Sequence, residues 1–247
     1  MTYGLARARE RLFDDRGHLF LLALDHAQSG VMPGLERSWE LVDRLAQSEL
    51  GGFILNVGLA PLLARPGLLR KKLVLRSSFG GSALASEYAQ AHSNHVSPET
   101  ALALGADAVL MMAVFGGADH AGLQEMAADI DDYHRLCIPV IVEILAADFS
   151  KTNSLEVQLN GARAAAELGA DLVKAFYVEG FDRVVSSCPA PVILAGGPKD
   201  RDIESVAAQA LRDGARGFAF GRNIFQSPDP AATIRNLAGI LDKATAV

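Results

Sequence analysis

The sequence has little of what several classes of protein require. It contains 2 cysteines among 247 residues, and Cys137 and Cys188 stand apart, without a CxxC pair or a histidine at the spacing of a zinc site. We expect both to be buried free thiols. No stretch approaches the roughly 20 uninterrupted apolar residues of a membrane span, and the charged N-terminus lacks the apolar segment of a signal peptide. These absences predict a soluble protein of the cytoplasm.

A run of lysine or arginine is also missing. The formal net charge is -6, which argues against nucleic acid and anionic membranes as partners. An anionic small-molecule substrate would therefore have to be held by a local site. The composition, with 50% hydrophobic and 21% charged residues, excludes a disordered chain and suffices for a large core. We expect one domain over residues 1–247, since α/β barrels of about 250 residues are common.

What the sequence does have is one junction that occurs four times: the end of an Ala/Leu-rich helix, a turn with glycine, and a short apolar run. The stretches are SELGGFILN (48–56), ALGADAVLMMAVF (103–115), ELGADLVKAFY (167–177) and RDGARGFAFG (212–221). Glycine supplies a left-handed cap, and the apolar runs are too short for helices and too continuous for half-exposed strands. Strands buried on both faces and alternating with helices predict a parallel sheet.

Eight such apolar runs can be counted along the chain. They cover residues 18–25, 52–56, 72–77, 108–115, 140–145, 172–177, 191–197 and 217–221. Helical patterns lie at 35–48, 98–104, 119–136, 154–168, 179–186, 202–213 and 230–244, with a shorter connection at 58–66. This order predicts an α/β fold, the single (β/α)8 or TIM barrel, with an open doubly wound sheet as the alternative. The absence of GxGxxG after the first run argues against a dinucleotide-binding sheet.

Polar residues gather where these strands end, which is where barrel enzymes carry their active sites. They are Asp25, His26, Asn56, Arg76, Glu143, Lys174 and Arg222. Because side chains alternate along a strand, Asp25 shares a face with Leu21 and Ala23. Lys174 likewise shares a face with Leu172. If these faces point into the barrel, Asp25 and Lys174 approach each other across its mouth.

Lys174 most needs an explanation, because it stands between Val173 and Ala175 in an apolar strand. Burial of an ammonium group is so unfavourable that such a lysine tends to lose its proton. A neutral amine can attack a carbonyl carbon and form a Schiff base, which acts as an electron sink. A lysine paired with a carboxylate such as Asp25 or Glu143 is the alternative, and spacing alone leaves both open.

Two glycine-containing stretches follow the last two strands, LAGGPKD (194–200) and FGRNIFQ (220–226). Many barrels bind phosphate at this place, with loop amides and the start of a short helix. Gly196 and Gly197 allow backbone N–H groups to approach an anion, and Arg222 offers a guanidinium fork. We expect a phosphate site here, and a pair of tight turns is the alternative.

Three further groups carry less information. His92 and His95 suggest a metal-binding pair, but no carboxylate or cysteine accompanies them at ligand spacing, so a solvated loop is favoured. Met111 and Met112 are expected to fill the core. Tyr177 alternates away from the lysine of its strand and is expected to face the helices. We therefore expect no metal and no cofactor.

Four stretches in their order and spacing resemble the class I aldolase family that holds archaeal-type fructose-bisphosphate aldolase, an aminodideoxyheptulosonate synthase and the thiolase of autoinducer-2 degradation. The stretches are LALDHAQSGVMPGLE, LGADAVLMMAVFGG, ELGADLVKAFYVEGFDRVVSSCPAPVILAGGPK and GARGFAFGRNIFQSPDP. The resemblance covers about residues 15–245. It implies a TIM barrel and a homo-oligomer, a pentamer or a decamer.

For the site, the resemblance implies that Lys174 forms the Schiff base and that Asp25 assists the acid/base steps. It implies further that the two glycine-containing loops hold a phosphate. The residues that we expect at the phosphate and the rest of the substrate are His26, Arg76, Gly196, Gly197, Gly221 and Arg222.

The end of the fifth strand departs from the family. The archaeal aldolases carry a YPRG motif there, with the tyrosine as proton donor and acceptor, and the corresponding residues here are Leu145, Ala146, Ala147 and Asp148. Leucine cannot move a proton, so we expect Glu143, a carboxylate late in a buried strand, to do so instead. The run from 176 to 227 resembles the autoinducer-2 thiolase more closely, which also lacks that tyrosine.

The leading hypothesis is a Schiff-base lyase acting on a phosphorylated ketose, with fructose 1,6-bisphosphate as the default substrate. One alternative keeps Lys174 but transfers an acyl group to coenzyme A, as a thiolase does with a phosphorylated dione. Another is a sugar-phosphate-binding protein without catalysis. A metal-dependent aldolase is disfavoured, because the sequence contains no visible ligand cluster.

Overall fold

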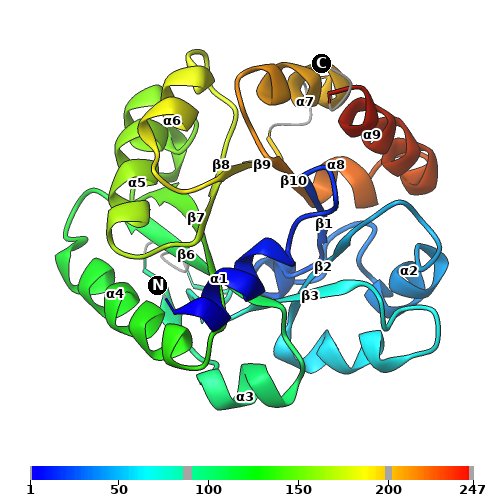
Figure 1. Cartoon of the computed structure of the whole chain (residues 1–247), viewed down its shortest axis with the longest axis horizontal. Helices are drawn as coiled ribbons and strands as arrows, with labels where there is room; N and C mark the ends of the chain where they lie inside the picture. Colours follow the sequence, from blue (N-terminus) through cyan, green and yellow to red (C-terminus); the bar gives the residue numbers. More distant parts are fainter. Residues whose placement is uncertain (1, 86–90, 198–201, 245–247) are drawn as a thin grey trace.

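A computed structural model describes residues 2–85, 91–197 and 202–244. In these ranges eight parallel strands close into a barrel in the order β1-β10-β9-β8-β7-β6-β3-β2 (Figure 1). They are β1 (Leu19–Ala23), β2 (Gly52–Asn56), β3 (Lys72–Arg76), β6 (Ala108–Phe115), β7 (Val140–Ala146), β8 (Leu172–Ala175), β9 (Val192–Ala195) and β10 (Gly217–Phe220). Each expected run forms one strand, and the closed barrel confirms the predicted fold over the open sheet. That one domain spans residues 1–247 stays a prediction.

Helices surround the barrel (Figure 1). They include α2 (Ser38–Arg44), α3 (Pro98–Ala103), α4 (His120–Arg135), α5 (Leu155–Glu167), α6 (Phe181–Ser187), α7 (Ile203–Arg212) and α9 (Pro230–Ala244), and the 3-10 segment η2 (Val57–Ala64) follows β2. Several begin at a side-chain cap. Ser97, Ser154 and Asp202 each accept a hydrogen bond from a backbone N–H group two or three residues further on, which satisfies a donor that the helix itself leaves free.

Glycines at the ends of three helices have the left-handed conformation that the repeated junction predicts. Gly105, Gly169 and Gly214 follow α3, α5 and α7 with φ of 71°, 116° and 100°. A side chain would strain the backbone at such angles. The chain can therefore turn from helix to strand within a few residues.

The strands bury both faces, as their continuous apolar runs predict. One cluster fills the inside of the barrel and includes Leu19, Leu21, Ala23, Ile54, Val74, Ala108, Leu110, Ile141, Leu172, Ile193 and Ala219. A larger cluster packs the strands against the helices, and Tyr177 contacts it as expected. Since Ala23 and Leu172 lie inside, Asp25 and Lys174 continue the inward faces of their strands at the C-terminal end of the barrel.

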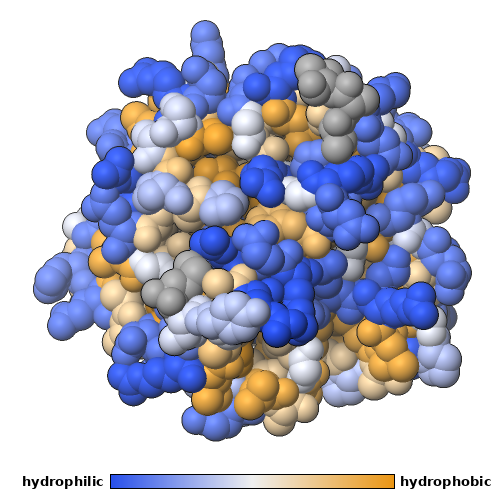
Figure 2. Space-filling model, viewed as in Figure 1, coloured by the Kyte–Doolittle hydropathy of each residue, from blue (hydrophilic) through white to orange (hydrophobic). Residues whose placement is uncertain are grey.

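An N-terminal helix is an element that the sequence patterns do not predict. Helix α1 (Tyr3–Glu10) lies across one end of the barrel, in front of the strands in Figure 1. Leu12 and Phe13, which follow it, join the cluster inside the barrel. Figure 2 shows the molecule from the same side, and the middle of that surface carries mostly hydrophilic side chains. Because α1 closes the N-terminal end of the barrel, a ligand has to enter from the opposite end.

Short elements in the loops at that opposite end also go beyond the prediction. The 3-10 turns η1 (His26–Ser29) and η3 (Phe149–Lys151) follow β1 and β7, and helix α8 (Arg222–Phe225) follows β10. The strands β4 (Ser78–Phe79) and β5 (Ser93–Asn94) form a small antiparallel pair after β3.

The cysteines differ from their prediction, since Cys137 and Cys188 are free thiols but only partly buried. Sγ of Cys137 lies 3.6 Å from Oγ1 of Thr2, so the start of α1 covers it on one side. Among the helices of the described residues, none combines the length and the apolarity needed to cross a membrane.

Leu12 tests whether the segment after α1 belongs to the core. Leu12 is 1% exposed, so Leu12→Ala should lower the free energy of unfolding by about 2 to 4 kcal/mol, through lost burial and the cavity left behind. The matched control is Leu69→Ala at a leucine that is 72% exposed, which should change it by less than about 0.5 kcal/mol. Urea unfolding measures both, and equal effects would contradict the assignment.

Candidate active site

A cavity of about 320 Å³ opens at the C-terminal ends of the strands. Asn56, which also ends a strand, does not line it. The cavity wall contains the residues that are predicted to carry the chemistry or bind the substrate: Asp25, His26, Arg76, Glu143, Lys174, Gly196, Gly197, Gly221 and Arg222. It also contains residues that the prediction does not include, among them Gln28, Met32, Met112, Phe149, Phe176 and Asn223. The structure brings the predicted residues together, and their chemical functions stay predictions.

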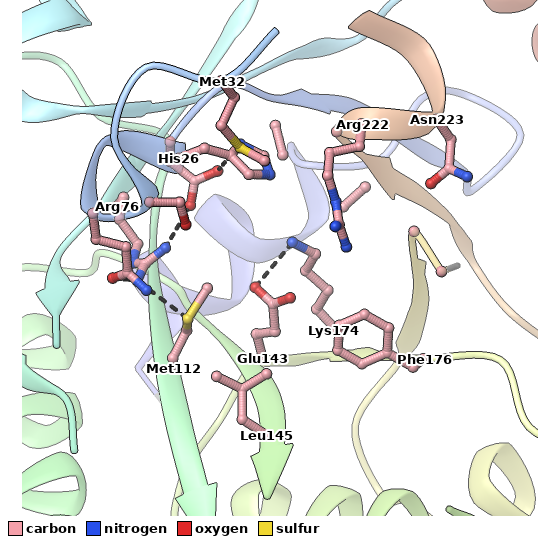
Figure 3. A pocket seen from close by; sticks show the side chains of 18 of the residues that line it. His26, Met32, Arg76, Met112, Glu143, Leu145, Lys174, Phe176, Arg222 and Asn223 are labelled. Carbon is pink, nitrogen blue, oxygen red and sulfur yellow. Dashed lines mark hydrogen bonds and ion pairs between the residues drawn. The ribbon is translucent and has the colours of Figure 1, made fainter. Parts of the chain in front are cut away.

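Lys174 and Glu143 lie beside each other on β8 and β7, which pair in this register. Nζ of Lys174 donates a hydrogen bond to Oε2 of Glu143 at 3.0 Å, and each residue is 5% exposed. In the view of Figure 3 the amine lies between this carboxylate and the guanidinium of Arg222. The pair matches the alternative in which a carboxylate holds the lysine. A carboxylate at this distance can also take a proton from the ammonium group, so pairing and nucleophilic attack are compatible.

Arg76 fixes Asp25 in a second buried ion pair, in which Nη1 donates to Oδ2 at 2.7 Å. The same guanidinium donates to the carbonyl oxygen of Ser78 at 2.6 Å and to Oε1 of Gln28 at 3.0 Å. Burial alone raises the pKa of Asp25, but Arg76 and further positive charges outweigh burial and hold that pKa below its usual value. Asp25 is therefore ionised at neutral pH. Asp25 lines the same cavity as Lys174, but Asp25 pairs with Arg76 whereas Lys174 pairs with Glu143.

His26 occupies the wall between Asp25 and the last strand. Its ring packs edge-on against Phe225 with centroids 5.2 Å apart, and its Nδ1 lies 4.0 Å from Oδ1 of Asp25. Burial lowers the pKa of His26 below its usual value, although the charge of Asp25 acts in the opposite direction. The neutral ring can then either donate or accept a hydrogen bond at a ligand.

Glycines at the ends of β9 and β10 bring bare backbone to the cavity. A Cβ atom on Gly196 would lie 2.6 Å from Oδ1 of Asn223, and one on Gly221 would lie 2.6 Å from Cε1 of His26, so neither position has room for a side chain. Gly197 has nothing within 4 Å of such an atom. Open backbone of this kind suits an anion. Residues 198–200 of the expected stretch lie outside the described residues.

Arg222 begins α8 beside these glycines and is exposed. Within residues 2–85, 91–197 and 202–244 its guanidinium makes no hydrogen bond or ion pair with another residue. Arg222 thus differs from Arg76, whose guanidinium nitrogens already donate hydrogen bonds within the protein. A free guanidinium next to open backbone can receive a phosphate with two parallel hydrogen bonds.

Two residues that were expected elsewhere lie beside Arg76, and one of them, Met112, lines the cavity. Met112 faces the cavity rather than the core, and its sulfur accepts a hydrogen bond from Nη2 of Arg76 at 3.1 Å (Figure 3). Met111 points to the outer cluster as expected. For His92 the solvated loop is wrong, because Nδ1 of His92 lies 3.5 Å from the same Nη2 and its Nε2 is buried. His95 is exposed, as expected.

The end of β7, where the sequence departs from the family motif, is apolar. Leu145 faces the cavity two residues beyond Glu143, and Phe149 of η3 lies at the rim. Asp148 is exposed and caps η3 by accepting a hydrogen bond from the N–H group of Ser150. Asp148 therefore does not reach the position of the missing tyrosine, whereas Glu143 lies in the cavity.

A buried glutamine on α5 fixes the ends of β7 and β8. Gln158 donates to the carbonyl oxygen of Thr152 at 2.6 Å and accepts a hydrogen bond from the N–H group of Phe176 at 2.9 Å. Oγ1 of Thr152 accepts from the N–H group of Ala146 at 3.0 Å. Leu145 and Phe176, which line the cavity, are thus held by backbone contacts on the side away from it.

The cavity combines an amine, two carboxylates, a neutral imidazole and a rim of open glycine backbone beside Arg222. In the described part of the chain, no cluster of three or more His, Cys, Asp or Glu side chains is placed to hold a metal ion. The groups that are present suit addition of an amine to a carbonyl carbon, with proton transfer by neighbouring carboxylates.

Comparison with known proteins agrees with the resemblance inferred from the sequence. The profile described as "DeoC/LacD family aldolase" matches residues 20–227. The 2-amino-4,5-dihydroxy-6-oxo-7-(phosphonooxy)heptanoate synthase of Streptomyces griseus is 30% identical over 237 residues, which cover 92% of this chain and 86% of that protein. The 3-hydroxy-5-phosphonooxypentane-2,4-dione thiolase of Escherichia coli O139:H28 (strain E24377A / ETEC) is 28% identical over 262 residues, covering 98% and 83%.

Solved structures point the same way. An archaeal fructose 1,6-bisphosphate aldolase superposes with a TM-score of 0.83 and 26% identity, covering 96% of this chain and 98% of that one. A second structure with the same TM-score and identity is of an archaeal fructose-1,6-bisphosphate aldolase with "the catalytic Lys covalently bound to the carbinolamine intermediate of the substrate". The names of these proteins differ in the reaction, but each of them specifies a phosphorylated compound.

His92 gives the stability of the protein a testable dependence on pH. Burial first, and the charge of Arg76 second, lower the pKa of His92 from 6.5 to about 4. Below pH 6.5 the His92 ring therefore binds a proton in the unfolded chain but not in the folded protein. The unfolding free energy consequently falls as the pH falls toward 4. Between pH 7 and pH 4 the protein should lose about 2 to 3 kcal/mol more unfolding free energy than the His92→Gln variant.

Urea unfolding at each pH measures the difference between the two proteins. His95→Gln, at the exposed histidine, is the matched control and should keep the steep decline. A His92→Gln variant that loses stability as steeply as the unchanged protein would show that His92 does not resist protonation.

Proposed function

Because the chain belongs to the DeoC/LacD family of aldolases, we propose that it is a Schiff-base-forming lyase that breaks or makes a C–C bond in a phosphorylated ketose. The observation that carries this proposal is the buried amine of Lys174, which lines the cavity 3.0 Å from a carboxylate that can accept its proton. The open glycine loops and the free guanidinium of Arg222 supply a place for one phosphate beside it.

The first step joins the ketone to the protein. Glu143 takes a proton from the Lys174 ammonium group, and the free amine attacks the carbonyl carbon of the ketone. A proton moves from the attacking nitrogen to the carbonyl oxygen, which gives a carbinolamine. The proton held by Glu143 then passes to that oxygen, which leaves as water, and the iminium ion remains. The glycine loops and Arg222 hold the phosphate meanwhile, and such anchoring aligns the reacting atoms.

Cleavage follows from the electron demand of the iminium ion. Asp25 or Glu143 removes the proton of the hydroxyl group on the far carbon, its C–O bond becomes a carbonyl, and the C–C electron pair moves into the iminium. The far half leaves as an aldehyde and an enamine remains on Lys174. Protonation of the enamine carbon and hydrolysis by water then release the ketone phosphate. Condensation is the same sequence in reverse.

Support for the lysine also comes from a relative. The archaeal aldolase in the carbinolamine complex is described as acting through a catalytic Lys, and Lys174 is the lysine that lines this cavity within the described residues. Relatives named synthase and thiolase match at similar identity. They therefore support the phosphorylated ketone half that binds the lysine more than they support one particular reaction. Transfer to coenzyme A is the competing outcome, and products formed only when coenzyme A is present would favour it.

The assembly and the location stay proposals as well. The resemblance favours a homo-oligomer of five or ten subunits, and the sequence favours the cytoplasm.

Trapping with borohydride tests the proposed nucleophile. Incubation with dihydroxyacetone phosphate or fructose 1,6-bisphosphate, followed by reduction, should leave an adduct on Lys174 that peptide mass spectrometry locates. Lys174→Met should abolish the adduct, and Lys243→Met at an exposed lysine of α9 is the matched control that should keep it. Folded protein without an adduct from either compound would favour a binding protein without catalysis.

Glu143→Gln tests the proton acceptor while keeping the size of the side chain and a hydrogen bond to Lys174. Loss of the general base should lower kcat by about 10²- to 10⁴-fold. Glu179→Gln, on the exposed loop after β8, is the control and should leave kcat unchanged. Full turnover in Glu143→Gln would instead assign proton transfer to Asp25.

A further inference from the structure

We propose that this site takes a ketose with a single phosphate, and that the half beyond the scissile bond is an uncharged, largely apolar aldehyde. The inference rests on the proposed function and specifies its substrate. It replaces the default of fructose 1,6-bisphosphate, whose far half is itself phosphorylated.

The charges of the cavity provide for one phosphate. Among its described residues the cationic side chains are Arg76, Lys174 and Arg222. Arg76 donates to Asp25, and Lys174 is paired with Glu143. The two carboxylates thus balance two of the three cations, and only the guanidinium of Arg222 is free for a ligand. A second phosphate would find no free cation among these residues.

The strand order separates the two ends of a bound ketose. Arg222 follows β10 and Gly196 follows β9, whereas Met112 lies on β6, four positions from β10 in a ring of eight strands. Met112 is therefore on the wall opposite Arg222. Lys174 on β8 lies between the two walls. A ketose with its phosphate at β9 and β10 and its carbonyl carbon at Lys174 must extend toward β7 and β6.

The far half meets apolar side chains on that wall. Met112 and Leu145 face the cavity from β6 and β7, and Phe149 stands at the rim with 59% of its surface exposed. Figure 3 shows Met112 and Leu145 on the side of Glu143 away from Arg222. The guanidinium of Arg76 beside Met112 is already paired with Asp25, so a phosphate placed there would lose water without gaining a free cation among the described lining residues. It would also face the Glu143 carboxylate. An alkyl group would gain from leaving water at the same place.

The bond-forming chemistry does not need a charge on this half. In condensation the enamine carbon on Lys174 attacks the aldehyde carbon, and the aldehyde oxygen takes a proton to become the new hydroxyl group. Water then hydrolyses the iminium ion and frees the amine. Preference among aldehydes therefore depends on how the far wall binds them.

Competing condensations test the inference. Dihydroxyacetone phosphate is offered with butanal or with glyceraldehyde 3-phosphate, and kcat/KM is measured for each aldehyde. We expect butanal to be favoured by about tenfold or more. Equal values, a preference for glyceraldehyde 3-phosphate, or no condensation with butanal would each overturn the inference.

A variant that places a cation at the rim gives a second test of the inference. Phe149→Arg should move the ratio of kcat/KM toward glyceraldehyde 3-phosphate by about tenfold, because the phosphate then has a partner. Leu69→Arg, the same gain of charge at an exposed apolar residue just before β3, should leave the ratio unchanged. If Phe149→Arg does not change the ratio, the far half does not contact this wall and the inference fails.

The failure of this inference can be told apart from failure of the proposed function. A borohydride-stable adduct of dihydroxyacetone phosphate on Lys174, combined with a preference for the phosphorylated aldehyde, would keep the lyase and reject the apolar half. The absence of any adduct in folded protein would reject both.

Discussion

The site depends on the register of β7 and β8, which sets Glu143 beside Lys174 at the end of a dry barrel. Beneath them Ile141 and Leu172 fill the interior, so neither charge has water on that side. Removal of one member of such a buried pair commonly costs about 3 to 5 kcal/mol, because the other charge stays uncompensated. The contact that makes a buried lysine tolerable thus also supplies a proton acceptor within hydrogen-bond distance. Structural pairing and reactivity are not competing explanations for this residue.

The same principle shapes the rest of the cavity. Asp25, which follows β1, and Arg76 of β3 neutralise each other. Ser78, Gln28 and Met112 accept hydrogen bonds from the other nitrogens of the guanidinium. Each buried charge therefore meets an opposite charge from another strand. What is left over is a positive charge at the β10 rim, next to backbone that carries no side chain. This pairing leaves the free positive charge at one end of the site, and that asymmetry underlies the proposal that the phosphate binds there.

Local patterns predicted much of this architecture. Glycine caps and apolar runs are signals within a few residues, and they located each barrel strand and the inward face that carries Lys174. Features that depend on distant contacts were missed. Leu12 and Phe13 look like ordinary apolar residues until the open end of the barrel is known. His92 is partly buried only because the chain returns it to Arg76. Spacing could not choose between Asp25 and Glu143 as the partner of Lys174, because that choice depends on which strands are neighbours. For Met112 the signal was present, since alternation along β6 separates it from Met111.

The apolar end of β7 links the chemistry to the choice of substrate. A tyrosine at position 145 would present a hydroxyl group that can both move protons and bind a polar far half, and Leu145 can do neither. In the proposed mechanism Glu143, which already contacts the lysine, makes up for the first loss. The second has no replacement on this wall, where Met112 and Phe149 are also apolar. In the proposed mechanism the amine reacts only with the ketone half, so proteins that share this lysine can differ in the half that leaves. Their divergent names are what one would expect if the walls, rather than the nucleophile, set the reaction.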